Sequence, residues 1–187
     1  MKFIETNIPG ALLLEPERLI DERGFFARTW CLREFAEHGL DLTFAQCSIS
    51  FNAQSGTLRG LHYQVAPYEE TKLVRCTRGA VYDVLLDLRP ASATYTKWQA
   101  FELSCENHYQ LYIPPGVAHG FMTLSDNCEV SYQISIEYHA ASAHGVRWDD
   151  PAFAIAWPAK PQIISDRDRR HPLWTTDVCP LGERRSA

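Results

Sequence analysis

The sequence predicts an all-β fold, an antiparallel sandwich or barrel of which the jelly roll is one form. Short apolar segments with strand-like alternation recur along the chain. Turn-forming residues such as glycine, proline and asparagine stand between these segments. Helical periodicity over about 10–15 residues, which an α/β fold needs between its strands, is almost absent.

The predicted strands follow one another with little else between them. Gly79 and Pro90 mark two of the turns. The aromatic run that ends at Trp30 favours a strand, because aromatic residues are enriched in sheets. One helix is predicted at 32–38, ended by Gly39. The predicted strands are 11–14, 24–30, 42–49, 57–63, 72–77, 80–88, 97–103, 110–113, 120–124 and 129–136.

The clearest alternation lies in the predicted strand 80–88. Successive side chains of a strand point to opposite faces of the sheet. The apolar set, which we expect to form the core face, is Tyr82, Val84, Leu86 and Leu88. The set expected on the opposite face is Val81, Asp83, Leu85 and Asp87.

Length and charge narrow the class of protein. The chain has 187 residues, of which 45% are hydrophobic, enough for the core of one domain spanning 1–187. A net charge of -5 argues against a nucleic-acid-binding protein, so an anionic ligand must meet a local basic cluster. The basic run 167–170 belongs to a C-terminal tail expected to pack across the barrel and to fray at 182–187.

The cysteines and the N-terminus bear on the compartment. No C-x-x-C pair occurs, which argues against a zinc ribbon and a redox dithiol and favours buried thiols. No signal-peptide pattern begins the chain, and no run approaches the roughly 18 apolar residues of a membrane helix. We therefore expect a cytoplasmic protein without membrane contact. The cysteines are Cys31, Cys47, Cys76, Cys105, Cys128 and Cys179.

The segment 58–64 carries the residues with the clearest chemical potential. Its two leucines fit a core face, whereas Arg59 and His62 point elsewhere, into a cleft. Lys72 follows ten residues after the histidine. A histidine can take up a proton near neutral pH, and the two cations could hold an anionic carbonyl substrate. The alternative is a surface histidine beside solvated charges.

Several segments together form a recognisable pattern: Asp21–Phe26, Leu58–Gln64, Lys72–Cys76, Tyr112–Phe121, Tyr132, Tyr138, Gly145–Pro151 and Ser165–Asp168. Their residues and their order, from about residue 4 to residue 174, resemble the dTDP-4-dehydrorhamnose 3,5-epimerase family. The resemblance implies a cupin-like jelly roll that acts without a cofactor on a nucleotide-sugar. It also implies a homodimer in which the N-terminal strand, within 1–10, is exchanged with the partner.

The resemblance also implies catalytic roles. The reaction would invert C3, C5 or both in a nucleotide-linked 4-keto-6-deoxy sugar, whose protons at these carbons are acidified by the ketone. His62 would be the base, and Asp168 would orient its ring. Lys72 would stabilise the enolate, and Tyr132 would return a proton from the opposite face. Without the resemblance, Tyr132 would be read as a core aromatic and Asp168 as a solvated charge.

A second set of residues would contact the substrate. Arg23 and Arg59 match positions at the nucleotide, where guanidinium groups suit paired phosphate oxygens. The remaining candidates are Gln46, Ser48, Tyr138, Arg28, Arg167 and His119. A metal site at His62, Gln64 and His119 is the alternative for a metal-dependent cupin, although no H-x-H pair is present. A non-catalytic cupin that only binds its ligand is a further alternative.

Three departures from the family pattern leave the nucleotide open. Arg28 and Ala143 replace glutamates typical of the thymidine-linked type, and Cys47-Ser48 replaces Asp-Asn. A changed charge at a buried contact can be worth several kcal/mol. We therefore expect a cytidine- or guanosine-linked sugar, or a thymidine-linked sugar held differently. The number of inverted centres stays open.

Overall fold

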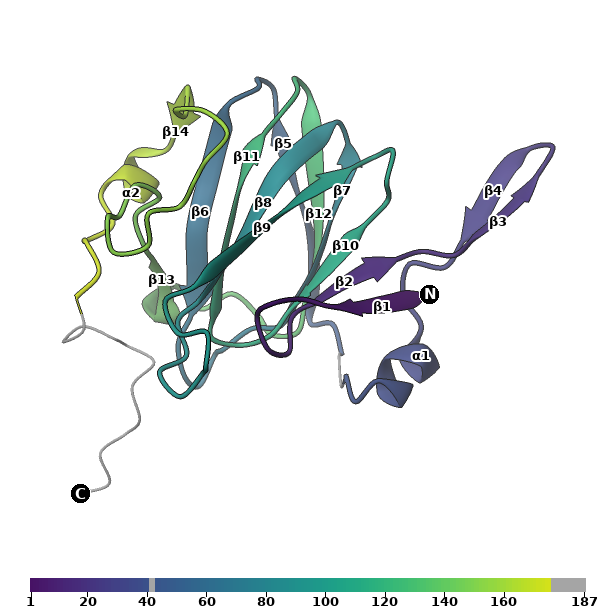
Figure 1. Cartoon of the computed structure of the whole chain (residues 1–187), viewed down its shortest axis with the longest axis horizontal. Helices are drawn as coiled ribbons and strands as arrows, with labels where there is room; N and C mark the ends of the chain where they lie inside the picture. Colours follow the sequence, from purple (N-terminus) through teal and green to yellow (C-terminus); the bar gives the residue numbers. More distant parts are fainter. Residues whose placement is uncertain (41–42, 176–187) are drawn as a thin grey trace.

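Two antiparallel sheets face each other in the structure, a computed structural model that describes residues 1–40 and 43–175 (Figure 1). The first sheet has the order β1 (Lys2–Glu5), β2 (Leu12–Glu15), β10 (Gln110–Ile113), β7 (Lys72–Arg78), β12 (Cys128–Ile134) and β5 (Gln46–Asn52). The second has the order β13 (Ala143–Gly145), β6 (Thr57–Gln64), β11 (Val117–Thr123), β8 (Ala80–Asp87) and β9 (Trp98–Ser104), with β14 (Ile163–Ile164) parallel to β6. The predicted all-β jelly-roll-like class is confirmed.

Three pieces lie outside the two sheets. The hairpin of β3 (Arg18–Asp21) and β4 (Gly24–Ala27) projects away from them (Figure 1). The helices are α1 (Leu32–Glu37), as predicted, and the single turn α2 (Asp166–Arg169), with a 3-10 turn at Ala140–Ser142. No helix in the described ranges is long and apolar enough to cross a membrane.

The predicted strands at 24–30 and 42–49 have other bounds in the structure. The first ends at Ala27, because Trp30 turns into an apolar cluster with Phe35 of α1 and Phe44. The second begins at Gln46 and continues to Asn52. Residues 41–42 lie outside the described ranges. Strand β1 pairs with β2 of its own chain, and its exchange with a partner stays a prediction.

The inner core fills the space between the sheets. It includes Val74 from β7 and Leu111 from β10 on one side, and Leu85 from β8 and Phe121 from β11 on the other. The predicted core face of β8 is confirmed, since Val84, Leu86 and Leu88 lie in a buried apolar cluster, but the opposite face, which carries Leu85, is buried too and points into the inner core. Both faces of β8 are buried, so alternation of apolar and polar residues could not reveal which face is inside.

A second apolar layer explains why the other face of β8 is buried. Val84, Leu86 and Leu88 pack outward against the chain that follows β13. That chain supplies the buried Val146 and Phe153, and the half-buried Trp157 packs on the same cluster. The prediction that the C-terminal part packs on the barrel is confirmed for the described residues. The predicted fraying at 182–187 falls outside them.

The cysteines are free thiols in the described part of the chain. Cys76 and Cys128 are buried, as predicted, and Cys31 and Cys105 are half-buried. Cys47 is exposed, which contradicts the prediction of buried thiols, because its side chain lies on the solvent face of the edge strand β5. Cys179 lies outside the described residues.

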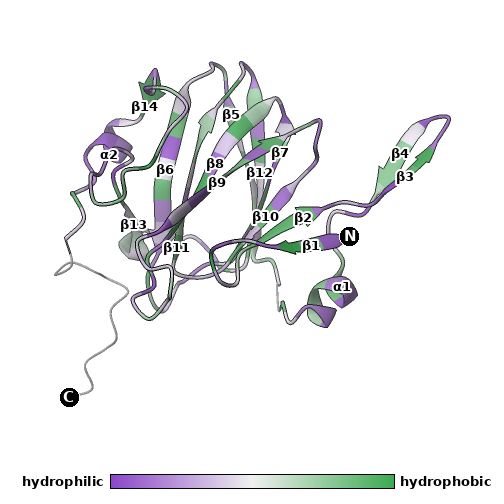
Figure 2. Ribbon diagram, in the orientation of Figure 1, coloured by the Kyte–Doolittle hydropathy of each residue, from purple (hydrophilic) through white to green (hydrophobic). Residues whose placement is uncertain are grey.

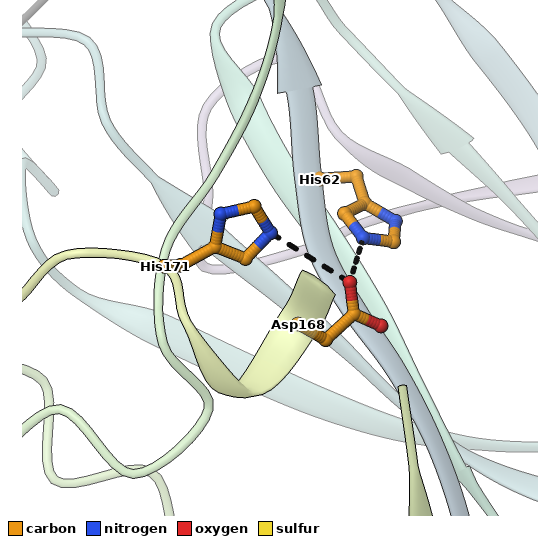
Figure 3. A group of neighbouring side chains, drawn as sticks. All are labelled: His62, Asp168 and His171. Carbon is orange, nitrogen blue, oxygen red and sulfur yellow. Dashed lines mark hydrogen bonds and ion pairs between the residues drawn. The ribbon is translucent and has the colours of Figure 1, made fainter. Parts of the chain in front are cut away.

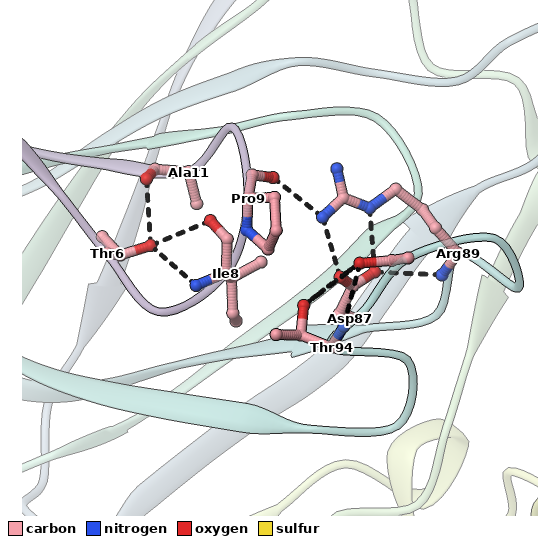
Figure 4. A network of polar contacts seen from close by, with 8 residues as sticks. Thr6, Ile8, Pro9, Ala11, Asp87, Arg89 and Thr94 are labelled. Atoms are coloured by element: carbon pink, nitrogen blue, oxygen red, sulfur yellow. Dashed lines mark hydrogen bonds and ion pairs between the residues drawn. The ribbon is translucent and has the colours of Figure 1, made fainter.

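A buried carboxylate ties the N-terminal loop to the second sheet (Figure 4). Asp87 is fully buried and accepts two hydrogen bonds of 2.8 Å from the Arg89 guanidinium, and others from Ser92 (2.6 Å) and Thr94 (2.7 Å). Arg89 in turn donates to the Pro9 carbonyl oxygen at 2.9 Å. Burial raises the pKa of Asp87, but these hydrogen bonds outweigh it and hold the pKa below its ordinary value.

Asp87→Ala should lower the free energy of unfolding at pH 7 by about 3 kcal/mol, because it leaves a partly buried guanidinium without its partner. Since the folded-state pKa of Asp87 is lowered, its stabilisation is full above pH ~4 and is lost as the pH falls below that value. Urea unfolding at pH 7 and pH 3 tests both statements. Asp149→Ala is the matched control: Asp149 also binds an arginine through two bonds, but it is exposed, so about 1 kcal/mol or less should be lost.

Candidate active site

A cavity of about 590 Å³ opens between the two sheets and gathers most of the predicted site residues. Its walls come from β5, β7 and β12 of the first sheet and from β6, β11 and β13 of the second, with β14 and α2 at one side. The predicted residues that line it are Gln46, Ser48, Arg59, His62, Lys72, His119, Tyr132, Tyr138, Arg167 and Asp168. Arg23 and Arg28 are not among them.

A β-bulge in β6 aims two of these residues into the cavity. Arg59 pairs with Phe121 and His62 pairs with His119, so three steps along β6 match two along β11. The extra residue places Arg59 and His62 on the same face. Gly60 allows this at φ +115°, where a Cβ would lie 2.6 Å from the Gly120 Cα atom. The glycine of the motif Arg-Gly-Leu-His thus allows the bulge that points both side chains into the cavity.

His62 and Asp168 form a hydrogen-bonded pair at the cavity wall. The His62 Nε2 atom lies 2.7 Å from Asp168 Oδ1, and the Gly60 amide donates to Oδ2 at 3.3 Å. The Ser165 hydroxyl accepts from the Asp168 amide at 3.1 Å, which caps α2 and fixes the position of Asp168. The two residues predicted as base and orienting carboxylate are therefore in contact.

The Asp168 carboxylate stays ionised in this setting. Burial raises its pKa, but the contacts from His171 and His62 and the Gly60 amide outweigh burial and hold the pKa well below the ordinary range. Because an ionised carboxylate only accepts hydrogen bonds, His62 Nε2 carries the proton. The Nδ1 atom of His62 is left with the free lone pair that a base needs.

His171 also contacts Asp168, from the other side (Figure 3). Its Nε2 atom lies 3.6 Å from Asp168 Oδ1. The nearest ligand atoms of His62, Asp168 and His171 all lie within 4.8 Å of one another, so this is the group that could hold a metal ion. The alternative metal set from the sequence is not assembled, because the Gln64 amide is bonded to Tyr68 and His139 and His119 is bonded to Asp83.

His119 is held by a carboxylate that the sequence did not single out. Its Nε2 atom lies 3.0 and 2.9 Å from the two carboxylate oxygens of Asp83. Both side chains are almost fully buried. Because His119 lies directly across from His62 in the β6–β11 pairing, the cavity has two histidine–aspartate pairs on one wall.

Tyr132 lies on the opposite wall, in β12 of the first sheet. Its ring also packs on the inner core and lies edge-on to His119, with ring centroids 6.0 Å apart. Burial raises the pKa of Tyr132 above its ordinary value, Asp83 raises it further, and Arg59 partly offsets both. The phenol is therefore a proton donor that stays protonated at neutral pH.

Lys72 does not stand alone as the sequence suggested. Its Nζ atom forms an ion pair of 2.7 Å with Glu70, and both side chains are about nine-tenths buried. The same Nζ atom lies 3.5 Å from the His62 carbonyl oxygen. Glu70 therefore reduces the positive charge that Lys72 can offer to an enolate.

Arg59 and the residues of β5 form the mouth of the cavity. The Arg59 Nε atom donates to Asn52 Oδ1 at 2.7 Å, which fixes the guanidinium beside the opening. Gln46 and Ser48 are two apart on β5 and so share the cavity face. Cys47 lies between them and faces solvent, so that departure from the family pattern does not touch the cavity.

Two predicted contacts lie elsewhere in the chain. Arg23 is at the tip of the hairpin, exposed, and bound to Asp21. Arg28 follows β4, and its guanidinium donates to Glu34 of α1 at 2.7 Å. Within one chain, neither reaches the cavity.

Three residues of the site were missed from the sequence. Asp83 lies two residues from Leu85 on a buried face, and an acidic residue in such a position signals a polar function. Glu70 precedes Lys72 by two residues, the spacing of a pair on one face of an extended chain. His171 follows Asp168 by three residues, the spacing of neighbours on a helical turn.

Comparison with known proteins agrees with this geometry. Residues 5–176 match the sequence model described as dTDP-4-dehydrorhamnose 3,5-epimerase. The chain is 42% identical over 173 residues to the Sinorhizobium fredii enzyme of that name, covering 92% of this chain and 89% of that one. It is 43% identical over 180 residues to the Escherichia coli enzyme, covering 95% of each.

Solved structures show the same likeness. The Bacillus anthracis dTDP-4-dehydrorhamnose 3,5-epimerase with TDP and PPi bound superimposes with a TM-score of 0.90 at 43% identity, covering 92% of this chain and 99% of that one. A Legionella pneumophila dTDP-6-deoxy-D-glucose-3,5-epimerase in complex with dTDP-4-keto-L-rhamnose gives 0.89 at 36% identity, covering 100% and 99%. The chain belongs to the dTDP-4-dehydrorhamnose 3,5-epimerase family.

Proposed function

We propose that this protein epimerises a nucleotide-linked 4-keto-6-deoxy sugar at the carbons next to the ketone, C3 and C5. One observation carries the proposal. The hydrogen-bonded pair of His62 and Asp168 lies on one wall of the cavity, and the protonated Tyr132 lies on the other. Inversion of a carbon needs such an arrangement, because the proton must leave on one face and return on the other.

The proposed reaction begins at His62. Its Nδ1 atom removes the proton alpha to the ketone, the C–H electron pair forms the enolate double bond, and the carbonyl oxygen gains the negative charge. Asp168 stabilises the resulting imidazolium. The enolate carbon then takes the phenolic proton of Tyr132 on the opposite face while the carbonyl reforms. Exchange with water restores the proton on Tyr132 and removes the one on His62.

We propose thymidine diphosphate as the carrier of the sugar. The Bacillus anthracis structure holds TDP, and the Legionella pneumophila structure holds a dTDP-sugar. The expectation of a different nucleotide relied on Arg28, Cys47-Ser48 and Ala143 together, and Arg28 binds Glu34 and does not line the cavity in its own chain. Ser48 and Ala143 remain as departures inside the cavity. Arg59 and Arg167 supply the positive charge for a diphosphate.

A panel of 4-keto-6-deoxy sugars linked to thymidine, cytidine and guanosine diphosphate tests the proposal in D₂O. We expect deuterium at C3 and C5 of the thymidine-linked sugar, with rates unchanged by a chelator. Deuterium at a single carbon would reduce the activity to that of a monoepimerase. No exchange with any sugar would contradict the proposed function, and a rate that needs added metal would favour the metal-dependent alternative.

We place the reaction in the cytoplasm. The cysteines of the described ranges are free thiols. Free thiols persist where glutathione and thioredoxin keep them reduced.

We also propose that the active form is a homodimer in which the β3–β4 hairpin reaches the partner's cavity. Figure 2 shows apolar colour along this hairpin, which projects from the sheets. Leu19 and Phe26 lie opposite each other in the hairpin and are 63% and 68% exposed, an apolar pair of the kind that marks an interface. The base of the hairpin is fixed by Arg18, which donates to the Glu106 and Asn107 carbonyl oxygens. In a dimer, the hairpin would bring Arg23 to the diphosphate.

Mixing two inactive variants tests this arrangement. Arg23→Ala and His62→Ala should each be impaired as homodimers. After unfolding and refolding together, a mixed dimer has one cavity with both residues intact. Half of the dimers would be mixed, so about a quarter of the wild-type activity should return. Mixed dimers that are seen by mass spectrometry but stay inactive would contradict a shared site.

A further inference from the structure

His171 lies next to the hydrogen-bonded pair of His62 and Asp168 and is not among the residues that line the cavity. Its Nε2 atom is buried, has no hydrogen-bond partner among the described residues, and lies 3.6 Å from Asp168 Oδ1. The His62 Nε2 atom lies 2.7 Å from the same oxygen. The two rings meet edge to face, with centroids 6.0 Å apart (Figure 3). Two imidazoles therefore converge on one carboxylate oxygen.

The position of His171 is fixed by the fold. Helix α2 is a single turn that begins after Ser165 and ends at Arg169, and the chain that follows it brings the His171 ring back beside Asp168. A Cβ at Gly145 would overlap the His171 ring, so the ring lies directly against the backbone of β13. A second cavity, of about 180 Å³, borders His171 and is lined by Trp174 among others. His171 is thus accommodated by a glycine.

We propose that His171 is a positioning residue for the epimerase reaction, a second donor to the Asp168 carboxylate. The proposal relies on the function proposed above. Because an ionised carboxylate only accepts hydrogen bonds, His171 interacts best with Asp168 when its Nε2 atom carries a proton. Hydrogen bonds between catalytic groups are often long without substrate and shorten when it binds. His171 would then hold the carboxylate against His62 and take up part of its charge.

Sharing the carboxylate has a consequence for the base. The Asp168 charge favours the imidazolium form of His62, and a second donor on the same oxygen weakens that pull. Without His171, the Asp168 carboxylate should be held less firmly against His62, so the base should be less well oriented. Arg167 on α2, Tyr63 on β6 and His144 on β13 line the second cavity with His171. They are the same in all His171 variants, so differences among those variants report His171.

His171→Phe tests the proposal, because it fills the same space without a donor. We expect kcat for deuterium exchange to fall about tenfold and KM to change less than about twofold. His171→Gln, which keeps a donor near the Nε2 position, should restore kcat. His38→Phe is the control, since His38 stacks on Phe3 far from the cavity and should match the wild type.

The readouts separate this role from a structural one. Thermal unfolding and TDP calorimetry report whether each variant is folded. A folded His171→Phe with an unchanged kcat, or a His171→Gln as impaired as His171→Phe, would overturn the proposal. If His171→Phe does not fold, His171→Asn replaces it, since its amide is too short to reach Asp168.

If the wild type itself shows no exchange, the proposed function fails. If the wild type exchanges in a His62-dependent way and the His171 variants match it, only the role of His171 fails.

Discussion

His62→Ala should lose deuterium exchange at every carbon that the wild type epimerises, by about 10²–10⁴-fold. The Nδ1 atom of His62 is the free basic nitrogen on the wall that also carries Arg59. Among the described residues that line the cavity, His119 is bonded to Asp83 and Lys72 is paired with Glu70, so neither is free to replace it. The measurement is proton NMR of the sugar ring in D₂O over several hours.

The fold should survive this substitution. The His62 side chain is 40% exposed toward the cavity and contributes little to the apolar core. TDP calorimetry should therefore give nearly wild-type affinity, because the diphosphate contacts proposed at Arg59 remain. Exchange at an undiminished rate in a variant that binds TDP normally would remove His62 from the role of base.

Tyr132→Phe should separate two events that His62→Ala stops together. Proton abstraction needs only the base, so loss of label from a specifically deuterated sugar should continue within about tenfold of the wild-type rate. Inversion needs a donor on the opposite wall and should fall by about a hundredfold or more. The reason is that burial and Asp83 raise the pKa of Tyr132, so the phenol carries the proton that the carbon needs.

The comparison requires both rates from one sample. Washout is measured by mass spectrometry and inversion by the ring coupling constants in NMR. Phenylalanine keeps the packing of the Tyr132 ring on the inner core and on His119, so the protein should remain folded. Equal loss of washout and inversion would mean that Tyr132 serves abstraction as well, for example by stabilising the enolate.

Much of the fold could be predicted because its strands are short and bounded by turn residues. Helix α1 and strand β10 match their predicted ranges within a residue. The sequence could not show which face of β8 points into the inner core, because the C-terminal chain also buries the outer face. Strand β14 could not be predicted either, since two residues that pair with β6 leave no pattern in the sequence.

Site residues could be predicted where the residue type alone defines the role. They could not be predicted where the role depends on which side chains lie beside the residue in the fold. His62 and Asp168 are 106 residues apart, and only the family order linked them before the structure placed them 2.7 Å apart. The sequence overstated the positive charge that Lys72 offers to a substrate. The ion pair with Glu70 that reduces this charge depends on the conformation of the residues just before β7. Arg28 was assigned to the cavity on its position in the motif, whereas Glu34 of α1 binds it.

The bulge in β6 limits how this enzyme can change its substrate during evolution. Arg59 and His62 share one short stretch of backbone, locked by the contact of Gly60 with Gly120. The separation between the proposed phosphate contact and the proposed base is therefore set by this stretch of backbone, and a substitution in either side chain leaves the backbone separation unchanged. A descendant that accepts a larger sugar or another base must change the facing wall and the rim. Ser48 and Ala143, where this chain departs from the family pattern, lie in those places.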